Sequence, residues 1–286
     1  MANPSYILTT SAPDTTGIVA AVSGFLAERR LSITESHHFL DPPTNRSYLR
    51  TEFRDGGAGV PPVTRLESEF RPIAAHFGME WGIHDTSRRC RVLIGVSKTG
   101  YCLNSMLNRW QTGVLPIEVI GVFSNHEDHR RLTEWYGVPY HYLPIGADGR
   151  EAQEARLMAL FEAGRADLMV LARYMQVLTS ATCARLAGRA INIHHSFLPG
   201  FKGARPYQQA YERGVKLIGA TAHYITDDLD DGPIIEQEVE RVDHSKSPEE
   251  LTVIGHDIES VVLNRAVRWH AEHRVFVHGV RTVILR

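Results

Sequence analysis

Hydrophobic residues in the first 84 positions change their spacing several times, and each change predicts a new element. Spacings of three and four residues predict one helix after 14–17 and a second over 63–77. Alternation with a period of two predicts strands at 6–10, 32–40, 47–53 and 79–83. The resulting order of strand, helix, strand, strand, helix, strand indicates a ferredoxin-like domain over 1–84.

Beyond a polar linker at 85–89, apolar runs alternate with helical stretches, which is typical of a mostly parallel sheet covered on both faces. This pattern predicts a doubly wound α/β domain over 90–286. Six strands are expected in one sheet, at 92–97, 118–123, 140–143, 167–172, 190–193 and 217–225. A closing helix is expected at 247–272, where Ser247 can cap the helix and Pro248 suits its first turn.

Composition narrows the class of protein. The chain has 286 residues, and its 31 basic and 33 acidic residues give a net charge of -2, so no basic surface for nucleic acid is indicated. No apolar run approaches the roughly 18 to 20 residues that span a bilayer, and the N-terminus has no leader pattern. The three cysteines lack a Cys-x-x-Cys spacing, which favours reduced thiols. A cytoplasmic protein without a membrane partner is therefore expected.

The candidate catalytic residues lie at and after the end of the strand expected at 190–193. In an open parallel sheet, ligands bind beyond the carboxyl ends of the strands. Asn192 can donate an amide N–H to a developing oxyanion, and His194 points to the same side of an extended backbone. Asp230, in the acidic loop 226–233, is the carboxylate expected to orient His194. These three residues predict an acyl-chemistry site.

Several short segments resemble the folate-dependent formyltransferase domain, the family that includes glycinamide ribonucleotide transformylase. They are Asn192-Ile193-His194, Leu198-Pro199, His223-Tyr224 and Leu229-Asp230-Asp231-Gly232-Pro233. The resemblance implies a formyl group taken from 10-formyltetrahydrofolate by a metal-free catalytic trio, Asn192, His194 and Asp230, with His223 beside the site. No permanently bound cofactor is implied.

The whole chain resembles the formyltetrahydrofolate deformylases, in which an ACT domain precedes the formyltransferase-like domain. Residues 12–18 resemble the ACT ligand loop, and this implies a homo-oligomer with a small amino-acid effector, such as glycine or methionine, near Asp14, Thr16, Gly17 and Ile18. The resemblance implies hydrolysis of 10-formyltetrahydrofolate to tetrahydrofolate and formate. The formate would supply purine synthesis and balance one-carbon pools.

Two departures from the transformylase pattern favour water as the acceptor. His195 replaces a Pro, and Asp231 replaces a Gly, so both changes put polar groups beside the formyl carbon. Deformylases usually carry His before the Cys-Leu pair at 102–103, whereas this chain carries Tyr101. By resemblance, the substrate-binding residues are expected to be Arg173, Tyr174, Met175, Gln176, Val177, Leu178, His195, His223, Asp227 and Asp231.

Three alternatives stay open. A zinc hydrolase could use His194, His195, His223 and an acidic residue. However, adjacent histidines on an extended backbone should point to opposite faces, and no His-Glu-x-x-His helix is present. The same fold could instead pass the formyl group to an amine. A non-catalytic amino-acid sensor is the third alternative, and it is disfavoured because all three catalytic positions carry the expected residues.

Overall fold

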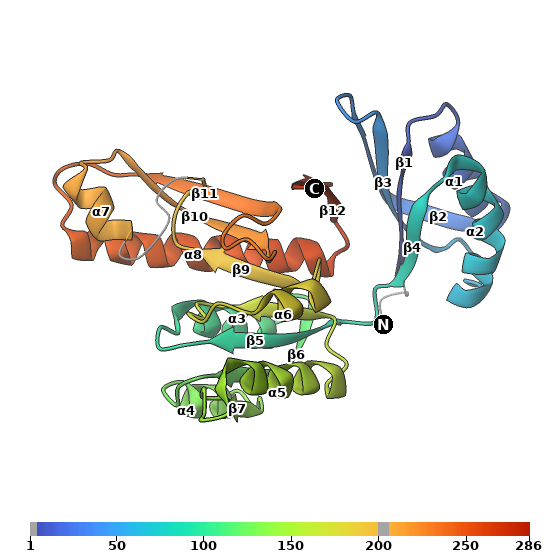
Figure 1. Cartoon of the computed structure of the whole chain (residues 1–286). Coiled ribbons are helices and arrows are strands. Elements are labelled where there is room, and N and C mark those ends of the chain that lie inside the picture. The colour runs from blue at the N-terminus through green and yellow to red at the C-terminus, as the bar shows by residue number, and fades with distance from the viewer. Residues whose placement is uncertain (1–4, 200–205) are drawn as a thin grey trace. The chain divides into compact units, whose positions relative to one another are not determined.

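The computed structural model describes residues 5–199 and 206–286 (Figure 1). By its contacts the chain divides into two compact units. The first contains the residues up to Arg89 together with Glu272–His278 and Val283–Arg286, and the second contains Cys90–Ala271 and Gly279–Thr282. The end of the chain, which the sequence pattern grouped with the second domain, is therefore shared between the two units.

The first unit has the predicted order of elements. They are β1 (Ser5–Pro13), α1 (Ile18–Glu28), β2 (Leu31–Asp41), β3 (Arg46–Asp55), α2 (Val63–Phe77) and β4 (Glu80–Asp85). The strands form one antiparallel sheet in the order β2-β3-β1-β4. Leu8 from β1 and Phe53 from β3 pack with Phe25 and Phe70 from the helices, and all four are nearly fully buried. The alternating strand residues thus meet the apolar faces of both helices.

Arg50 on β3 is a buried cation in the first unit, with a side chain only 1% exposed. It forms ion pairs with Glu35 and Glu52, and its Nε donates to the carbonyl of Glu272 at 3.0 Å. Arg274 also pairs with Glu35, at 3.0 Å. The charge of Arg50 is therefore compensated by carboxylates, as a buried charge requires.

The second unit contains a seven-stranded sheet in the order β11-β10-β9-β8-β5-β6-β7 (Figure 1). Its strands are β5 (Cys90–Val96), β6 (Ile117–Ser124), β7 (Tyr140–Tyr142), β8 (Leu168–Leu171), β9 (Ala190–His194), β10 (Leu217–Tyr224) and β11 (Ile234–Arg241). β5 to β9 are parallel, and β10 runs antiparallel to both β9 and β11. The mostly parallel α/β prediction is confirmed, but the prediction of six strands was wrong. β11 was missed because Glu236, Glu238 and Glu240 give it the charged pattern of an edge strand.

Helices cover both faces of this sheet. α3 and α8 contact each other, and α8 packs along β9, β10 and β11. On the other face, side chains of α5 and α6 share a core with β5 and β8. The helices of the unit are α3 (Tyr101–Gln111), α4 (Arg130–Trp135), α5 (Gly149–Ala163), α6 (Ser180–Arg185), α7 (Pro206–Glu212) and α8 (Pro248–Ala271), and the chain ends in a hairpin of β12 (Val275–His278) and β13 (Arg281–Ile284).

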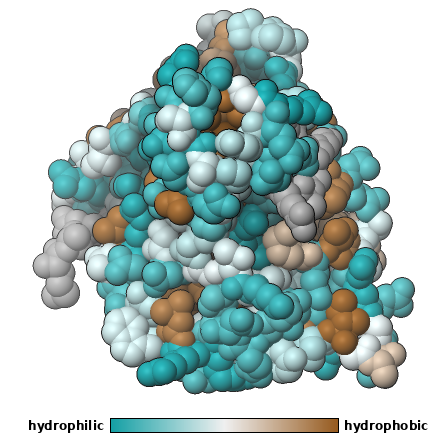
Figure 2. All heavy atoms as spheres, turned by 90° about the vertical axis from the view of Figure 1, so that its left-hand side faces the viewer, coloured by the Kyte–Doolittle hydropathy of each residue, from teal (hydrophilic) through white to brown (hydrophobic). Residues whose placement is uncertain are grey.

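The predicted start of α8 is confirmed as a capping box. The Ser247 hydroxyl accepts a hydrogen bond from the Glu250 backbone N–H at 3.2 Å, and the Glu250 carboxylate accepts one from the Ser247 N–H at 2.8 Å. No helix in the described parts of the chain is long and apolar enough to cross a membrane. On the face shown in Figure 2, hydrophobic residues form small, scattered patches among hydrophilic ones.

Candidate active site

The candidate site lies where β9 and β10 meet the loop that follows β10. Asn192 and His194 are the third and last residues of β9, so they share one side of that strand. In the antiparallel pairing of β9 with β10, His223 lies opposite Asn192. Strand register alone therefore brings the two predicted catalytic residues of β9 together with His223.

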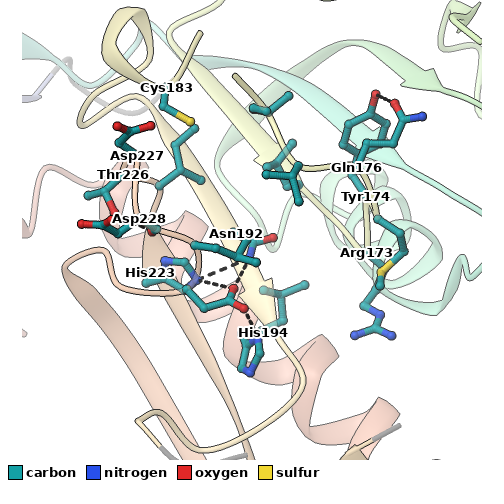
Figure 3. Close-up of a pocket in the computed structure, with 18 of the residues that line it drawn as sticks. Arg173, Tyr174, Gln176, Cys183, Asn192, His194, His223, Thr226, Asp227 and Asp228 are labelled. Atoms are coloured by element: carbon teal, nitrogen blue, oxygen red, sulfur yellow. Dashed lines mark hydrogen bonds and ion pairs between the residues drawn. The ribbon is translucent and has the colours of Figure 1, made fainter. Parts of the chain in front are cut away.

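Asp230 completes the cluster from the loop after β10 (Figure 3). Its Oδ2 lies 3.1 Å from His194 Nδ1, and its Oδ1 lies 3.6 Å from His223 Nε2 and 3.5 Å from Asn192 Nδ2. Burial raises the pKa of the Asp230 carboxyl, but hydrogen bonds from His194 and His223 outweigh burial and hold that pKa well below its usual range. Asp230 is therefore an anion that accepts hydrogen bonds from His194 and Asn192 and faces the ring of His223.

Gly232 allows the loop to bring Asp230 this close. A Cβ at Gly232 would lie 1.7 Å from the carbonyl oxygen of Tyr224. The backbone N–H of Tyr224 donates to the carbonyl of Pro233 at 3.0 Å, so the loop returns directly onto the end of β10. Asp230 itself has φ 57, in the left-handed region. The position of the carboxylate thus depends on a backbone approach that only glycine permits.

His194 has one engaged and one unengaged ring nitrogen. Its Nδ1 faces the Asp230 carboxylate, while its Nε2 is buried and has no hydrogen-bond partner in the described part of the chain. The side chain is only 5% exposed. A buried polar atom without a partner is uncommon, and it is the feature expected of an atom that is paired by substrate.

A cavity of about 290 Å³ adjoins these residues. In Figure 3 the Thr226–Asp228 loop forms one wall and the Arg173–Gln176 segment forms the other, with Asn192 between them. The structure brings together at this cavity all three predicted catalytic residues and the predicted substrate contacts Arg173, Tyr174, Met175, Gln176, Val177, Leu178, His195, His223 and Asp227. Asp231 is exposed and does not line the cavity.

Sequence reasoning missed several residues that line the cavity. They are Leu171, Cys183 and Ile193. Leu171 lies at the end of β8, so the rule that ligands bind beyond strand ends could have indicated it. Cys183 comes from α6, and no local signal in the sequence points to it.

The expected orientation of the adjacent histidines was wrong. The rings of His194 and His195 are stacked, with centroids 4.9 Å apart and an interplanar angle of 19°, and both line the cavity. Because β9 ends at His194, the alternation of side chains does not extend to His195. Among residues 5–199 and 206–286, no group of three or more His, Cys, Asp or Glu residues is arranged to hold a metal ion.

The predicted effector residues lie at the junction of β1 and α1. Gly17 has φ 102 and precedes the first residue of α1, and the Ile18 side chain is 3% exposed within the core of the first unit. A second cavity in this unit, of about 260 Å³, is lined by residues of β1 and β4 and by Val275, Phe276 and Val277. None of the four predicted effector residues lines that cavity.

Comparison with known proteins agrees with the geometry of the site. The Formyl transferase family matches residues 90–267, so the second unit is a domain of the formyltransferase class. A formyltetrahydrofolate deformylase from Corynebacterium sp. (strain P-1) is 49% identical over 98% of both chains. The crystal structure of the Burkholderia mallei deformylase, 50% identical, covers 99% of this chain and 100% of its own with a TM-score of 0.94. The chain belongs to the formyltetrahydrofolate deformylase family.

A transformylase structure matches a smaller share of the chain. Glycinamide ribonucleotide transformylase 1 from Symbiobacterium toebii is 31% identical and has a TM-score of 0.66. The match covers 69% of this chain but 95% of the transformylase. The predicted resemblance to deformylases, which extends over the whole chain, is confirmed.

Proposed function

We propose that this protein hydrolyses 10-formyltetrahydrofolate to tetrahydrofolate and formate. The names of its relatives support this reaction, because proteins 49% and 50% identical over nearly the whole chain are formyltetrahydrofolate deformylases. The observation that carries the proposal is the state of His194. Its Nδ1 is held by Asp230, and its buried Nε2 has no partner in the described residues, so it is prepared to meet a substrate oxygen or nitrogen.

In the proposed mechanism, a water molecule attacks the formyl carbon. The amide of Asn192 and the protonated Nε2 of His194 donate hydrogen bonds to the oxyanion that forms. One proton of the water leaves towards Asp230 through an ordered water, and His194 protonates N10 as the C–N bond breaks. Formic acid then ionises, and the proton on Asp230 returns to His194, which restores the site.

The low pKa of Asp230 determines its role in this mechanism. A carboxyl whose pKa is held well below its usual range keeps a proton only briefly. Asp230 therefore serves mainly to orient His194 and to stabilise its charged form during the reaction. His223 supports this arrangement, because its Nε2 lies 3.6 Å from Asp230 and 3.3 Å from Asn192 Nδ2.

The folate would be held by the two walls of the cavity. Met175 and Val177 are 61% and 49% exposed, so they offer apolar surface to an aromatic ring system. The Tyr174 hydroxyl donates to Gln176 Oε1 at 2.6 Å, which fixes a polar side chain on the same wall. Asp227, on the opposite wall, and Asp231, outside the cavity, are proposed to meet more polar parts of the substrate.

For the first unit, we propose an ACT-like domain over residues 1–84, joined by a linker at 85–89 to a catalytic domain over 90–286. The order β2-β3-β1-β4 and the two helices support a ferredoxin-like fold for this unit. We further propose that it assembles the chain into a homo-oligomer and binds a small amino acid near Asp14, Thr16, Gly17 and Ile18. A ligand-dependent rise in thermal stability would test that binding, because a ligand that binds the native state stabilises it.

The reaction is tested by incubating the purified protein with 10-formyltetrahydrofolate alone and measuring both products. Equal amounts of tetrahydrofolate and formate, formed without any amine, are expected. A parallel reaction with glycinamide added tests transfer to an amine. If formate appears in neither reaction and the formyl group is found on the amine, the protein is a transferase and the proposal of hydrolysis is wrong.

A further inference from the structure

A buried carboxylate on α8 lies behind the cavity and has no part in the proposed mechanism. The side chain of Glu259 is 0% exposed. Its Oε1 accepts a hydrogen bond from the Tyr207 hydroxyl at 2.6 Å, and its Oε2 accepts one from the Tyr101 hydroxyl and lies 3.3 Å from Arg173 Nη1. Burial raises the pKa of both tyrosines, so both hydroxyls stay protonated and donate. Each carboxylate oxygen of Glu259 thus has at least one donor.

Several elements are shaped around this carboxylate. Tyr101 is the first residue of α3, and its ring stacks on that of His256 with centroids 3.9 Å apart. Tyr207 lies on α7, and its side chain packs against α8 at Gly255. A Cβ at Gly255 would lie 2.0 Å from the hydroxyl oxygen of Tyr207. A buried anion is costly unless donors surround it, so this convergence indicates a defined role for the charge.

Arg173 connects Glu259 to the active site. It follows β8 with φ 65, in the left-handed region, and its side chain lines the cavity. The same Nη1 that faces Glu259 also contacts Nδ1 of His195. A guanidinium group can only donate, so Nδ1 of His195 must be the acceptor and the proton of the neutral ring must lie on Nε2.

We propose that Glu259 is a positioning residue that acts through Arg173 on His195. The two adjacent histidines are then held differently, since His194 donates from Nδ1 to a carboxylate while His195 accepts at Nδ1 from a guanidinium. With Nδ1 held in this way, the ring of His195 keeps a fixed orientation in the cavity, stacked on that of His194. Tyr101 and Tyr207 hold Glu259 in place.

This inference rests on the proposed hydrolysis, in which His194, whose ring stacks on that of His195, protonates the leaving nitrogen. Within the stack, the ring of His194 is held by Asp230 and acts on the formyl group. The ring of His195 is held by Arg173, which pairs with Glu259. The rings are nearly parallel, so a rotation of His195 would also displace His194.

A double-mutant cycle on kcat tests the coupling. Glu259→Gln keeps the shape of the side chain but removes the charge that holds Arg173, and we expect it to lower kcat about 10-fold. His195→Gln should lower kcat by at least as much, and the double variant should be no slower than His195→Gln alone. If the two losses multiply, or if Glu259→Gln leaves kcat unchanged, Glu259 does not act through His195.

The matched control is Asn264→Ala, on the same helix and also buried. Asn264 donates to Ser105 Oγ at 3.0 Å and makes no described contact with Arg173. Its loss should lower the melting temperature without changing kcat. An equal fall of kcat in Asn264→Ala would mean that any disturbance of α8 slows the enzyme, and the special role of Glu259 would be lost.

A second measurement does not depend on the folding of a Glu259 variant. Nitrogen NMR of the wild-type protein with 15N-labelled histidine reports which ring nitrogen carries the proton, and His195→Gln identifies the signals of His195. We expect an unprotonated Nδ1 and a protonated Nε2 at neutral pH. A proton on Nδ1 would overturn the inference. If the wild-type protein releases no formate, the proposed hydrolysis fails, but the spectrum still decides the state of His195.

Discussion

Replacing Asp230 by asparagine tests the charge at the centre of the site. Asparagine tolerates a positive φ, so the backbone at φ 57 is retained and the change is nearly isosteric. What is lost is the negative charge that faces His194 Nδ1 at 3.1 Å and His223 Nε2 at 3.6 Å. A hydrogen bond to a charged group contributes about 1.5–3 kcal/mol. Loss of that interaction in the transition state corresponds to a fall of about 10- to 150-fold in kcat.

The assay is formate release at saturating 10-formyltetrahydrofolate, with KM measured separately. KM should change little, because Asp230 holds the side chain that protonates N10 and does not hold the folate itself. Asp243→Asn is the matched control, since Asp243 is also a loop carboxylate that accepts hydrogen bonds, from Ser245, but it lies outside the cavity. A kcat for Asp230→Asn within about threefold of wild type would refute the role given to this carboxylate.

Three further substitutions test other parts of the account. Gly232→Ala should displace the loop, because its Cβ would lie 1.7 Å from the Tyr224 carbonyl oxygen. We expect a lower kcat and a loss of about 1–3 kcal/mol in the free energy of unfolding. Unchanged kcat and melting temperature would contradict this. Burial lowers the pKa of His270 to about 4, so the folded state binds fewer protons than the unfolded chain between about pH 6.5 and 4. The stability of the folded state should therefore decrease as pH falls through that window. The melting temperature of His270→Gln should depend less on pH than that of the wild type. Equal pH dependence of the two melting temperatures would disprove the low pKa of His270. Arg50→Met should cost about 1–3 kcal/mol, because the Glu272 carbonyl loses its donor at 3.0 Å and Glu35 loses one of its cations. A loss below about 0.5 kcal/mol in a denaturant titration would oppose this.

The sequence predicted the parts of the site that depend on local geometry. Asn192 and His194 could be identified because they alternate along one strand and stand at its carboxyl end. Asp230 was a candidate because it stands in an acidic loop, but its position beside His194 depends on the return of that loop, which Gly232 permits. His195 was placed on the wrong side because the last residue of β9 is not marked by any turn signal in the sequence.

Long-range features of the fold were not predictable from patterns of hydrophobic residues. β11 carries alternating glutamates after Ile234 and Ile235, so its apolar pattern is too short to predict the pairing with β10. Glu259 stands in an amphipathic helix, where a glutamate is ordinarily a solvated residue. Only the packing of α3 and α7 around α8 reveals that this carboxylate is buried and holds Arg173.

The central claim, that water attacks a formyl group held by Asn192, His194 and Asp230, is tested most directly with isotopically labelled water. The wild-type protein is incubated with 10-formyltetrahydrofolate in water enriched in 18O, without an amine, and the formate is analysed by mass spectrometry. The account predicts formate that contains 18O, in an amount equal to the tetrahydrofolate produced, and a rate that falls at least about 10-fold in Asp230→Asn. Formate without 18O, or tetrahydrofolate formed without formate, would contradict it.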